Sequence, residues 1–82
     1  MKDRYNGWTN WATWNVALWL GNSTETLDRA WRQCVRAARP ADRAKALAAF
    51  ARQEWPCGTP DMEGQTSWHT DVNWEEIIAT TN

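Results

Sequence analysis

The stretch that decides the fold is YNGWTNWATWNVALWL, residues 5–20, which holds four of the eight tryptophans in the chain. If this stretch is wound as a helix at about 100° per residue, apolar side chains occupy nearly its whole circumference. A helix of that kind is normally buried on several sides. We therefore predict a helix over residues 10–20 as the central element of the fold, with the other segments packed around it. Three of its tryptophans are expected in the core: Trp11, Trp14 and Trp19.

The next segment predicts the clearest amphipathic helix of the chain. Apolar side chains recur at helical intervals over residues 23–38 without a miss, and Asn22 with Glu25 fits a capping box at the start. The repeat places Trp31 and Cys34 on the buried face. Cys34 is therefore expected to be a buried free thiol.

Two more helices complete the predicted fold. Pro40 ends the second helix and fits the first turn of a third, which we place at residues 41–54 with an alanine-rich buried stripe. Prolines and glycines then predict an irregular loop over residues 55–72. A second capping box starts a short helix over residues 74–79. The sequence thus predicts an all-α fold, a single domain over residues 1–82 built as a small bundle of three main helices plus a short fourth around a tryptophan-rich core.

Residues 5–20 closely resemble the N-terminal segment of a family of small, mostly uncharacterised proteins encoded by phages, plasmids and other mobile elements. The typical form of that segment is NGW-[ST]-N-[WY]-E-T-W-x-V-x-L-W-[LI]. Residues 72–78, VNWEEII, are similar to the closing segment of such proteins. The resemblance implies a mobile-element origin and brings no catalytic residues. Ala12 stands where the family usually has a glutamate that would complete a capping box from Thr9, so we expect the first helix to be frayed or differently capped.

Composition excludes several classes of protein. The net charge of −1 over 82 residues is too small for an acidic mimic of DNA. No signal peptide is visible, and no apolar run approaches the roughly 20 residues needed to span a bilayer. Two cysteines, Cys34 and Cys57, do not make the disulfide framework of a small secreted domain. We expect a location in the reducing cytoplasm of a bacterial host, without membrane association.

Basic residues cluster in the middle of the chain. Between Asp28 and Glu54 they outnumber acids by four, whereas residues 55–82 hold five acids and no lysine or arginine. Arginine contacts carboxylates and phosphates in a bidentate manner. The arginines are therefore either a solvated face that maintains solubility or a contact surface for phosphates or for an acidic patch on a partner. We call the following five residues the arginine ridge and take them as candidate partner-binding residues: Arg29, Arg32, Arg36, Arg39 and Arg43.

Tryptophans at turns or near helix starts are further candidates for partner contacts. Full burial is less assured at such positions, and tryptophan, tyrosine and arginine are over-represented among the residues that dominate binding energies. Half-buried aromatic side chains at helix ends are also ordinary. The tryptophans that we take as candidate interface anchors are Trp8, Trp55 and Trp68.

No pattern of residues predicts catalysis or a cofactor. His69 is the only histidine, and neither it nor Cys57 has a second ligand at the spacing that metal sites require. A nucleophile would need an adjacent base and a third group to orient that base, and none is identifiable. We therefore expect no enzyme, no metal and no cofactor. A small enzyme or toxin that uses Cys57 or His69 stays as a third alternative.

Taken together, these patterns favour a non-enzymatic protein of mobile-element origin that works by binding. The most concrete form of the hypothesis is an anti-defence inhibitor of the anti-CRISPR type, which sterically occupies a host protein or ribonucleoprotein complex. The alternative is a small nucleic-acid-binding module or regulator that uses the arginine ridge.

Overall fold

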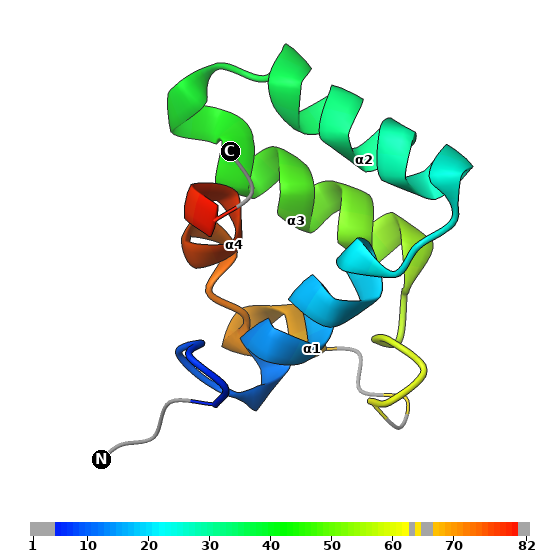
Figure 1. Ribbon diagram of the computed structural model, residues 1–82, viewed down its shortest axis with the longest axis vertical. Coiled ribbons are helices and arrows are strands. Elements are labelled where there is room, and N and C mark those ends of the chain that lie inside the picture. The colour runs from blue at the N-terminus through cyan, green and yellow to red at the C-terminus, as the bar shows by residue number, and fades with distance from the viewer. Residues whose placement is uncertain (1–4, 63, 65–66, 81–82) are drawn as a thin grey trace.

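The computed structural model describes residues 5–62, 64 and 67–80, and no strand is present in this part of the chain (Figure 1). The fold is all-α, as the sequence predicts. The four helices begin and end within two residues of the predicted positions, and residues 63, 65 and 66 of the expected loop lie outside the described residues. The elements in chain order are α1 (Trp11–Gly21), α2 (Glu25–Ala37), the 3₁₀ turn η1 (Pro40–Asp42), α3 (Arg43–Glu54), the 3₁₀ turn η2 (Trp68–Asp71) and α4 (Trp74–Thr80).

The element at the centre is α3. Both α2 and α4 pack against it, whereas α1 packs against α4 and η2 (Figure 1). The prediction that the first helix is the central element is therefore wrong. The alanines of α3 explain the difference, because short side chains around Leu47 and Ala51 let two neighbouring helices approach closely.

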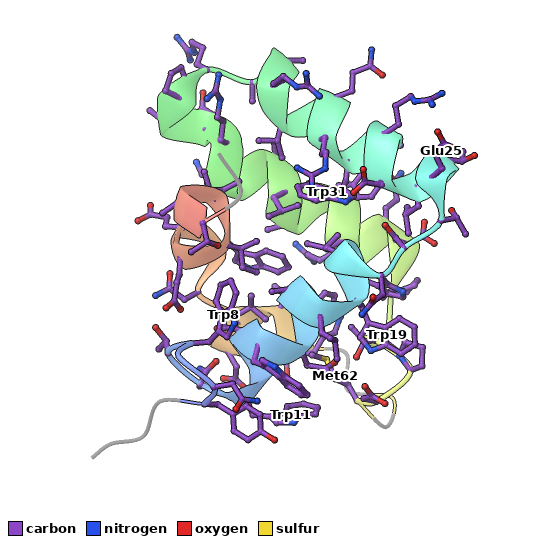
Figure 2. All side chains as sticks on the ribbon, viewed as in Figure 1. Trp8, Trp11, Trp19, Glu25, Trp31 and Met62 are labelled. Atoms are coloured by element: carbon purple, nitrogen blue, oxygen red, sulfur yellow. The ribbon has the colours of Figure 1, made fainter. Side chains whose placement is uncertain are left out.

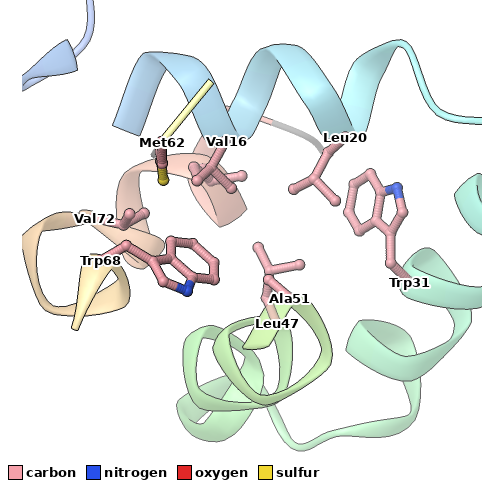
Figure 3. Close-up of a cluster of buried hydrophobic side chains, with 9 residues drawn as sticks. Val16, Leu20, Trp31, Leu47, Ala51, Met62, Trp68 and Val72 are labelled. Carbon is pink, nitrogen blue, oxygen red and sulfur yellow. The ribbon is translucent and has the colours of Figure 1, made fainter. Parts of the chain in front are cut away.

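A single cluster of nine buried apolar side chains joins the elements that the structure describes (Figure 3). Only two of the eight tryptophans belong to it, so the core is less tryptophan-rich than expected. Trp31 is 1% exposed, in agreement with its predicted burial. The members of the cluster are Val16, Leu20, Trp31, Leu47, Ala51, Met62, Trp68, Val72 and Ile77.

Burial along α1 differs from the prediction. Trp11, which is predicted to lie in the core, is 39% exposed, and Leu18 is 40% exposed. Trp14 and Trp19 are half-buried. Four residues of α1 are buried: Thr13, Asn15, Val16 and Leu20. The first two of these are polar.

Hydrogen bonds to distant segments hold that polar pair inside. Thr13 Oγ1 accepts from the Asn73 N–H at 2.8 Å. Asn15 donates its Nδ2–H to Asp61 Oδ2 at 2.8 Å, and its Oδ1 accepts from the Thr59 hydroxyl. Since buried polar groups are costly unless they are bonded, these partners fix which side of α1 is turned to the core.

The residue that caps the start of α2 is not the predicted one. Thr24, not Asn22, caps α2, because its hydroxyl accepts from the Leu27 N–H at 3.2 Å. Asn22 instead ends α1 and donates to the Leu18 carbonyl through both its backbone and its side-chain N–H groups.

Asn10, not Thr9, caps the first helix, because its Oδ1 accepts from the Thr13 N–H at 2.9 Å. The Thr9 N–H donates to Glu76 Oε1 at 3.0 Å, so a carboxylate from α4 binds the backbone just before α1. Of the second predicted capping box, between Asn73 and Glu76, one bond is present, from the Glu76 N–H to Asn73 Oδ1. The Asn73 N–H donates to Thr13 Oγ1.

The prediction of a buried thiol at Cys34 is wrong, because the residue is exposed. On α2 only Trp31 is fully buried. The apolar side of α2 is wider than the area that α3 covers. Residues at the margin of that side therefore stay exposed to solvent. Cys34 therefore lies beside Phe50 and Pro56 along an open groove between the two helices.

Candidate binding surface

A group of apolar side chains covers the outward side of α1. Within the helix its members recur at i, i+3 and i+7, which places them on the side opposite Val16 and Leu20. In Figure 2, Trp11 points away from the molecule, on the side of α1 remote from Trp31. We call this group the aromatic face; it consists of Tyr5, Trp11, Trp14 and Leu18.

A tight turn brings Tyr5 onto this face. Asn6 and Gly7 both have positive φ angles, 49° and 89°, which is typical of a two-residue type I′ turn. Two hydrogen bonds close the turn, between the N–H and C=O groups of Tyr5 and Trp8, at 2.7 and 2.8 Å. Tyr5 is thereby fixed against α1 although it precedes the helix.

The three rings of the aromatic face lie in contact with Trp14 in the middle. The ring centroids of Tyr5 and Trp14 are 4.8 Å apart at an interplanar angle of 57°. Those of Trp11 and Trp14 are 6.4 Å apart at 49°. Tilted contacts at this distance are favourable for aromatic pairs, so the rings support one another in a preformed arrangement.

In hydrogen bonding, the indoles of the aromatic face differ from those of Trp19 and Trp74. Trp19 donates its Nε1–H to Asp61 Oδ2 at 3.0 Å, and Trp74 donates its own to the His69 carbonyl at 3.1 Å. The indole N–H groups of Trp11 and Trp14 have no hydrogen-bond partner among the described residues. The aromatic face therefore presents apolar surface together with two unused donors.

The described segment that carries the aromatic face has no charged side chain of its own. Residues 5–24 contain no Asp, Glu, Lys, Arg or His. Asp61 accepts hydrogen bonds from Asn15 and Trp19, which, in that order of importance, lower its pKa below the ordinary value of 3.8. The face is thus suited to apolar and neutral polar ligands rather than to phosphates or carboxylates.

The arginine ridge is partly neutralised within the chain. Three exposed ion pairs join it to carboxylates one turn away, so five arginines less three carboxylates leave a net charge of +2. The pairs are Arg29–Glu25 at 3.2 Å, Arg32–Asp28 at 3.0 Å and Arg39–Asp42 at 3.3 Å.

The remaining arginines of the ridge differ in their availability. Arg43 donates its Nε–H to the Ala38 carbonyl at 3.3 Å. Arg32 also lies over the ring of Trp31, with its guanidinium carbon 4.5 Å from the ring centroid. Arg36 has no ion-pair partner in the described part of the chain and lines a shallow depression with Arg29. The ridge is therefore not one continuous free surface.

The tryptophans proposed as interface anchors prove to be tied to the core. Trp68 is 2% exposed, so the expectation that it offers a ring to a partner is wrong. It follows a loop rich in proline and glycine, but η2 turns its side chain inward, where its ring lies 5.8 Å from that of Trp74. Trp8 and Trp55 are half-buried and pack against the core cluster.

Sequence reasoning missed the residues that form the aromatic face. A helix that is apolar all round has no preferred side, so its periodicity could not show which tryptophans point outward. The one available signal in the sequence was the absence of charged residues across residues 5–24.

No catalytic constellation is visible in the residues that the structure describes. Cys57 is exposed, and His69 is half-buried beside Trp68. No three His, Cys, Asp or Glu side chains come together there in a way that could hold a metal ion. None of the described helices has the length and apolar character required to cross a membrane.

Comparison with known proteins gives a family but no function. The model of a family described as Family of unknown function (DUF7249) matches residues 1–78, so the chain belongs to that family. No curated protein and no solved structure matches the chain.

Proposed function

We propose that this member of a family of unknown function is a non-enzymatic binding protein that contacts a protein partner through the aromatic face. The observation that carries the proposal is the exposure of Trp11 and Leu18 on a helix whose opposite side is fixed in the core, with Tyr5 exposed beside them. Contiguous exposed apolar surface on a small protein is typical of an interaction site. Tryptophan and tyrosine contribute strongly at such sites.

The size of the aromatic face indicates what kind of contact it makes. Tyr5, Trp11 and Leu18 are each about two-fifths exposed, so these three residues of the face together offer on the order of 300 Å². A stable interface between two folded proteins buries roughly 800 Å² on each partner. The aromatic face is therefore the centre of a contact, which uncharged polar neighbours such as Asn6 and Asn10 extend.

Nucleic-acid binding through the arginine ridge is less well supported than protein binding through the aromatic face. Three of its members are engaged with carboxylates of the chain, and Arg32 is stacked on Trp31. A gel-shift series with random duplex and single-stranded DNA at low salt tests this alternative. Binding through phosphates must weaken steeply as salt rises, because counterions are released on binding. Tight binding at low salt that is lost in an Arg29→Glu/Arg36→Glu variant would favour the ridge over the aromatic face.

The finer form of the proposal is an anti-defence protein acting in a bacterial host, with a host protein or ribonucleoprotein complex as the partner. It is supported by the resemblance of residues 5–20 to proteins of mobile elements and by a preformed, uncharged contact surface. An inhibitor that blocks a host complex sterically needs such a contact surface but no catalytic residues.

A plating assay tests this form. The chain is expressed in a bacterial strain with an active CRISPR system and in the same strain without it, and both are challenged with a targeted phage. We expect the chain to raise plating in the first strain only. Trp11→Ala/Leu18→Ala should abolish the effect, and Arg29→Glu/Arg36→Glu should leave it unchanged, with circular dichroism confirming that both variants fold.

The broader proposal is tested by capture of host proteins on the immobilised chain. Proteins that bind through the aromatic face should be retained by the wild type and by Arg29→Glu/Arg36→Glu but lost from Trp11→Ala/Leu18→Ala. If a folded Trp11→Ala/Leu18→Ala variant captures the same proteins as the wild type, the aromatic face is not the binding surface.

A further inference from the structure

We propose that the segment bound by the aromatic face is a proline-rich stretch of the partner in the extended polyproline II conformation. This inference rests on the proposed function and names the chemistry of the partner. Polyproline II segments are commonly recognised by surfaces lined with aromatic rings. The rings here are three, in contact and already in place.

The unused indole donors distinguish this partner from a helical one. Along a helix each backbone carbonyl accepts from the N–H four residues later, so a helix packed on Trp11 and Trp14 would leave their donors buried without acceptors. An unmet buried donor costs about 1–3 kcal/mol. A polyproline II segment has no internal hydrogen bonds, so its carbonyls are available to both indoles. Its prolines bring no N–H that would itself need a partner.

The dimensions of the face agree with one turn of such a segment. The centroid distances of 4.8 and 6.4 Å mean that Tyr5, Trp14 and Trp11 together span no more than about 11 Å. One turn of polyproline II, three residues at 3.1 Å each, covers roughly 9 Å. Prolines spaced by one turn therefore meet the outer two rings, and the carbonyls between them meet the indole N–H groups.

Charge separates this partner from single-stranded nucleic acid, whose bases also stack on aromatic rings. Proteins that bind single strands combine the rings with a positively charged groove for the phosphates. Among the residues that the structure describes, 5–24 provide no cation, and the arginines lie on α2, on α3 or, in the case of Arg39, between these helices. A neutral, hydrogen-bond-accepting backbone rich in apolar rings fits the aromatic face better than a polyanion does.

The test follows the indole N–H signals of the eight tryptophans in a ¹H–¹⁵N spectrum while a peptide of about twelve prolines, roughly 37 Å long, is added. We expect the signals of Trp11 and Trp14 to shift. Four other indoles serve as internal controls because they are bonded within the chain or buried: Trp19, Trp74, Trp31 and Trp68.

Variants then separate ring contact from hydrogen bonding. Trp11→Ala should weaken binding of the proline peptide about tenfold or more, as for a dominant interface residue. Trp14→Phe keeps a ring and removes the donor, so it should weaken binding by about two- to tenfold, the range for one hydrogen bond. Thr26→Ala, at an exposed position of α2, is the matched control and should change nothing.

The inference is overturned if the proline peptide leaves the Trp11 and Trp14 signals unmoved. It is equally overturned if an alanine- and leucine-rich helical peptide or oligothymidylate binds more tightly than the proline peptide. If the proline peptide fails while Trp11→Ala/Leu18→Ala still loses its captured proteins, the proposed function stands and only the partner class is wrong. If the proline peptide fails to bind and the Trp11→Ala/Leu18→Ala variant still captures the same proteins as the wild type, both proposals fail.

Discussion

Two tryptophans show how strongly position decides the role of a residue. Trp31 on α2 is 1% exposed and contacts the core, whereas Trp11 on α1 is 39% exposed and contacts Trp14. Trp31→Ala should lower the free energy of unfolding by about 3–5 kcal/mol, the range for truncating a buried large aromatic side chain. Trp11→Ala should lower it by only about 0.5 kcal/mol, as for a surface position. Urea denaturation of both variants measures the two values, and equal losses would contradict the assigned burial.

A second prediction at this scale concerns Asp61 and acid. Its folded-state pKa lies below the ordinary 3.8 because the Asn15 amide, and after it the Trp19 indole, donates to the carboxylate. A carboxylate of this kind stabilises the fold fully above its unfolded-state pKa, and the contribution disappears as pH falls through the folded-state pKa. Asp61→Asn keeps an acceptor oxygen but no titration, so it should lose less stability than wild type between about pH 5.5 and pH 3.

The measurement is the urea midpoint of both proteins at the two pH values. The other carboxylates titrate alike in wild type and variant, so their effects cancel in the comparison. If the two proteins lose equal stability on acidification, Asp61 does not hold the 59–61 segment to α1 through its charge.

Residue-level burial was only partly predictable from the sequence. Trp31 was correctly placed in the core because it sits in a strong amphipathic repeat, whose spacing leaves little choice of side. Trp68 follows a proline- and glycine-rich loop, where no repeat indicates a direction, and its burial was missed. Thr13 and Asn15 are buried through partners some 44 to 60 residues away. Such contacts leave no trace in local spacing.

At the scale of the elements, the cap of α2 provides a matched pair of side chains. Thr24 accepts from the Leu27 N–H, while Asn22 belongs to the end of α1. Thr24→Ala should therefore cost about 1 kcal/mol, as expected for loss of an N-cap. Asn22→Ala should cost less, since the backbone N–H of residue 22 still donates to Leu18. Thermal melting followed by circular dichroism compares them, and a larger loss for Asn22→Ala would restore the capping box predicted from the sequence.

The start and end of each helix could be predicted from the sequence, whereas the side of α1 that faces the core could not. Pro40 and the capping residues mark ends through their own backbone chemistry, so those boundaries could be found locally. The side of α1 that faces inward depends on α4 and on the loop at 59–61. It could be found only once those segments were placed.

At the scale of the whole molecule, the aromatic face and the arginine ridge belong to different helices. Figure 1 shows α2 toward one end of the long axis, which extends 35 Å, and the start of α1 toward the other. Changes on one surface should therefore not disturb the other. Reversal of Arg29 and Arg36 to Glu should leave helical circular dichroism intact and change the free energy of unfolding by about 0.5 kcal/mol per site.

Arg32→Glu offers the contrasting case. Its guanidinium lies over Trp31 and pairs with Asp28. Reversal there would lose both contacts and create like-charge repulsion, so it should be more destabilising than Arg36→Glu. Equal melting temperatures for these two variants would show that Arg32 is only a solvated side chain.

The outward tryptophans of α1 form a preformed surface, whereas Trp31 and Trp68 belong to the buried core. Hydrogen exchange of the eight indole N–H groups tests this assignment most directly, since each tryptophan gives its own signal. Trp11 and Trp14 should exchange at once in heavy water, whereas Trp31 and Trp68 should exchange only on global unfolding. Slow exchange at Trp11 and Trp14 with rapid exchange at Trp31 would contradict it.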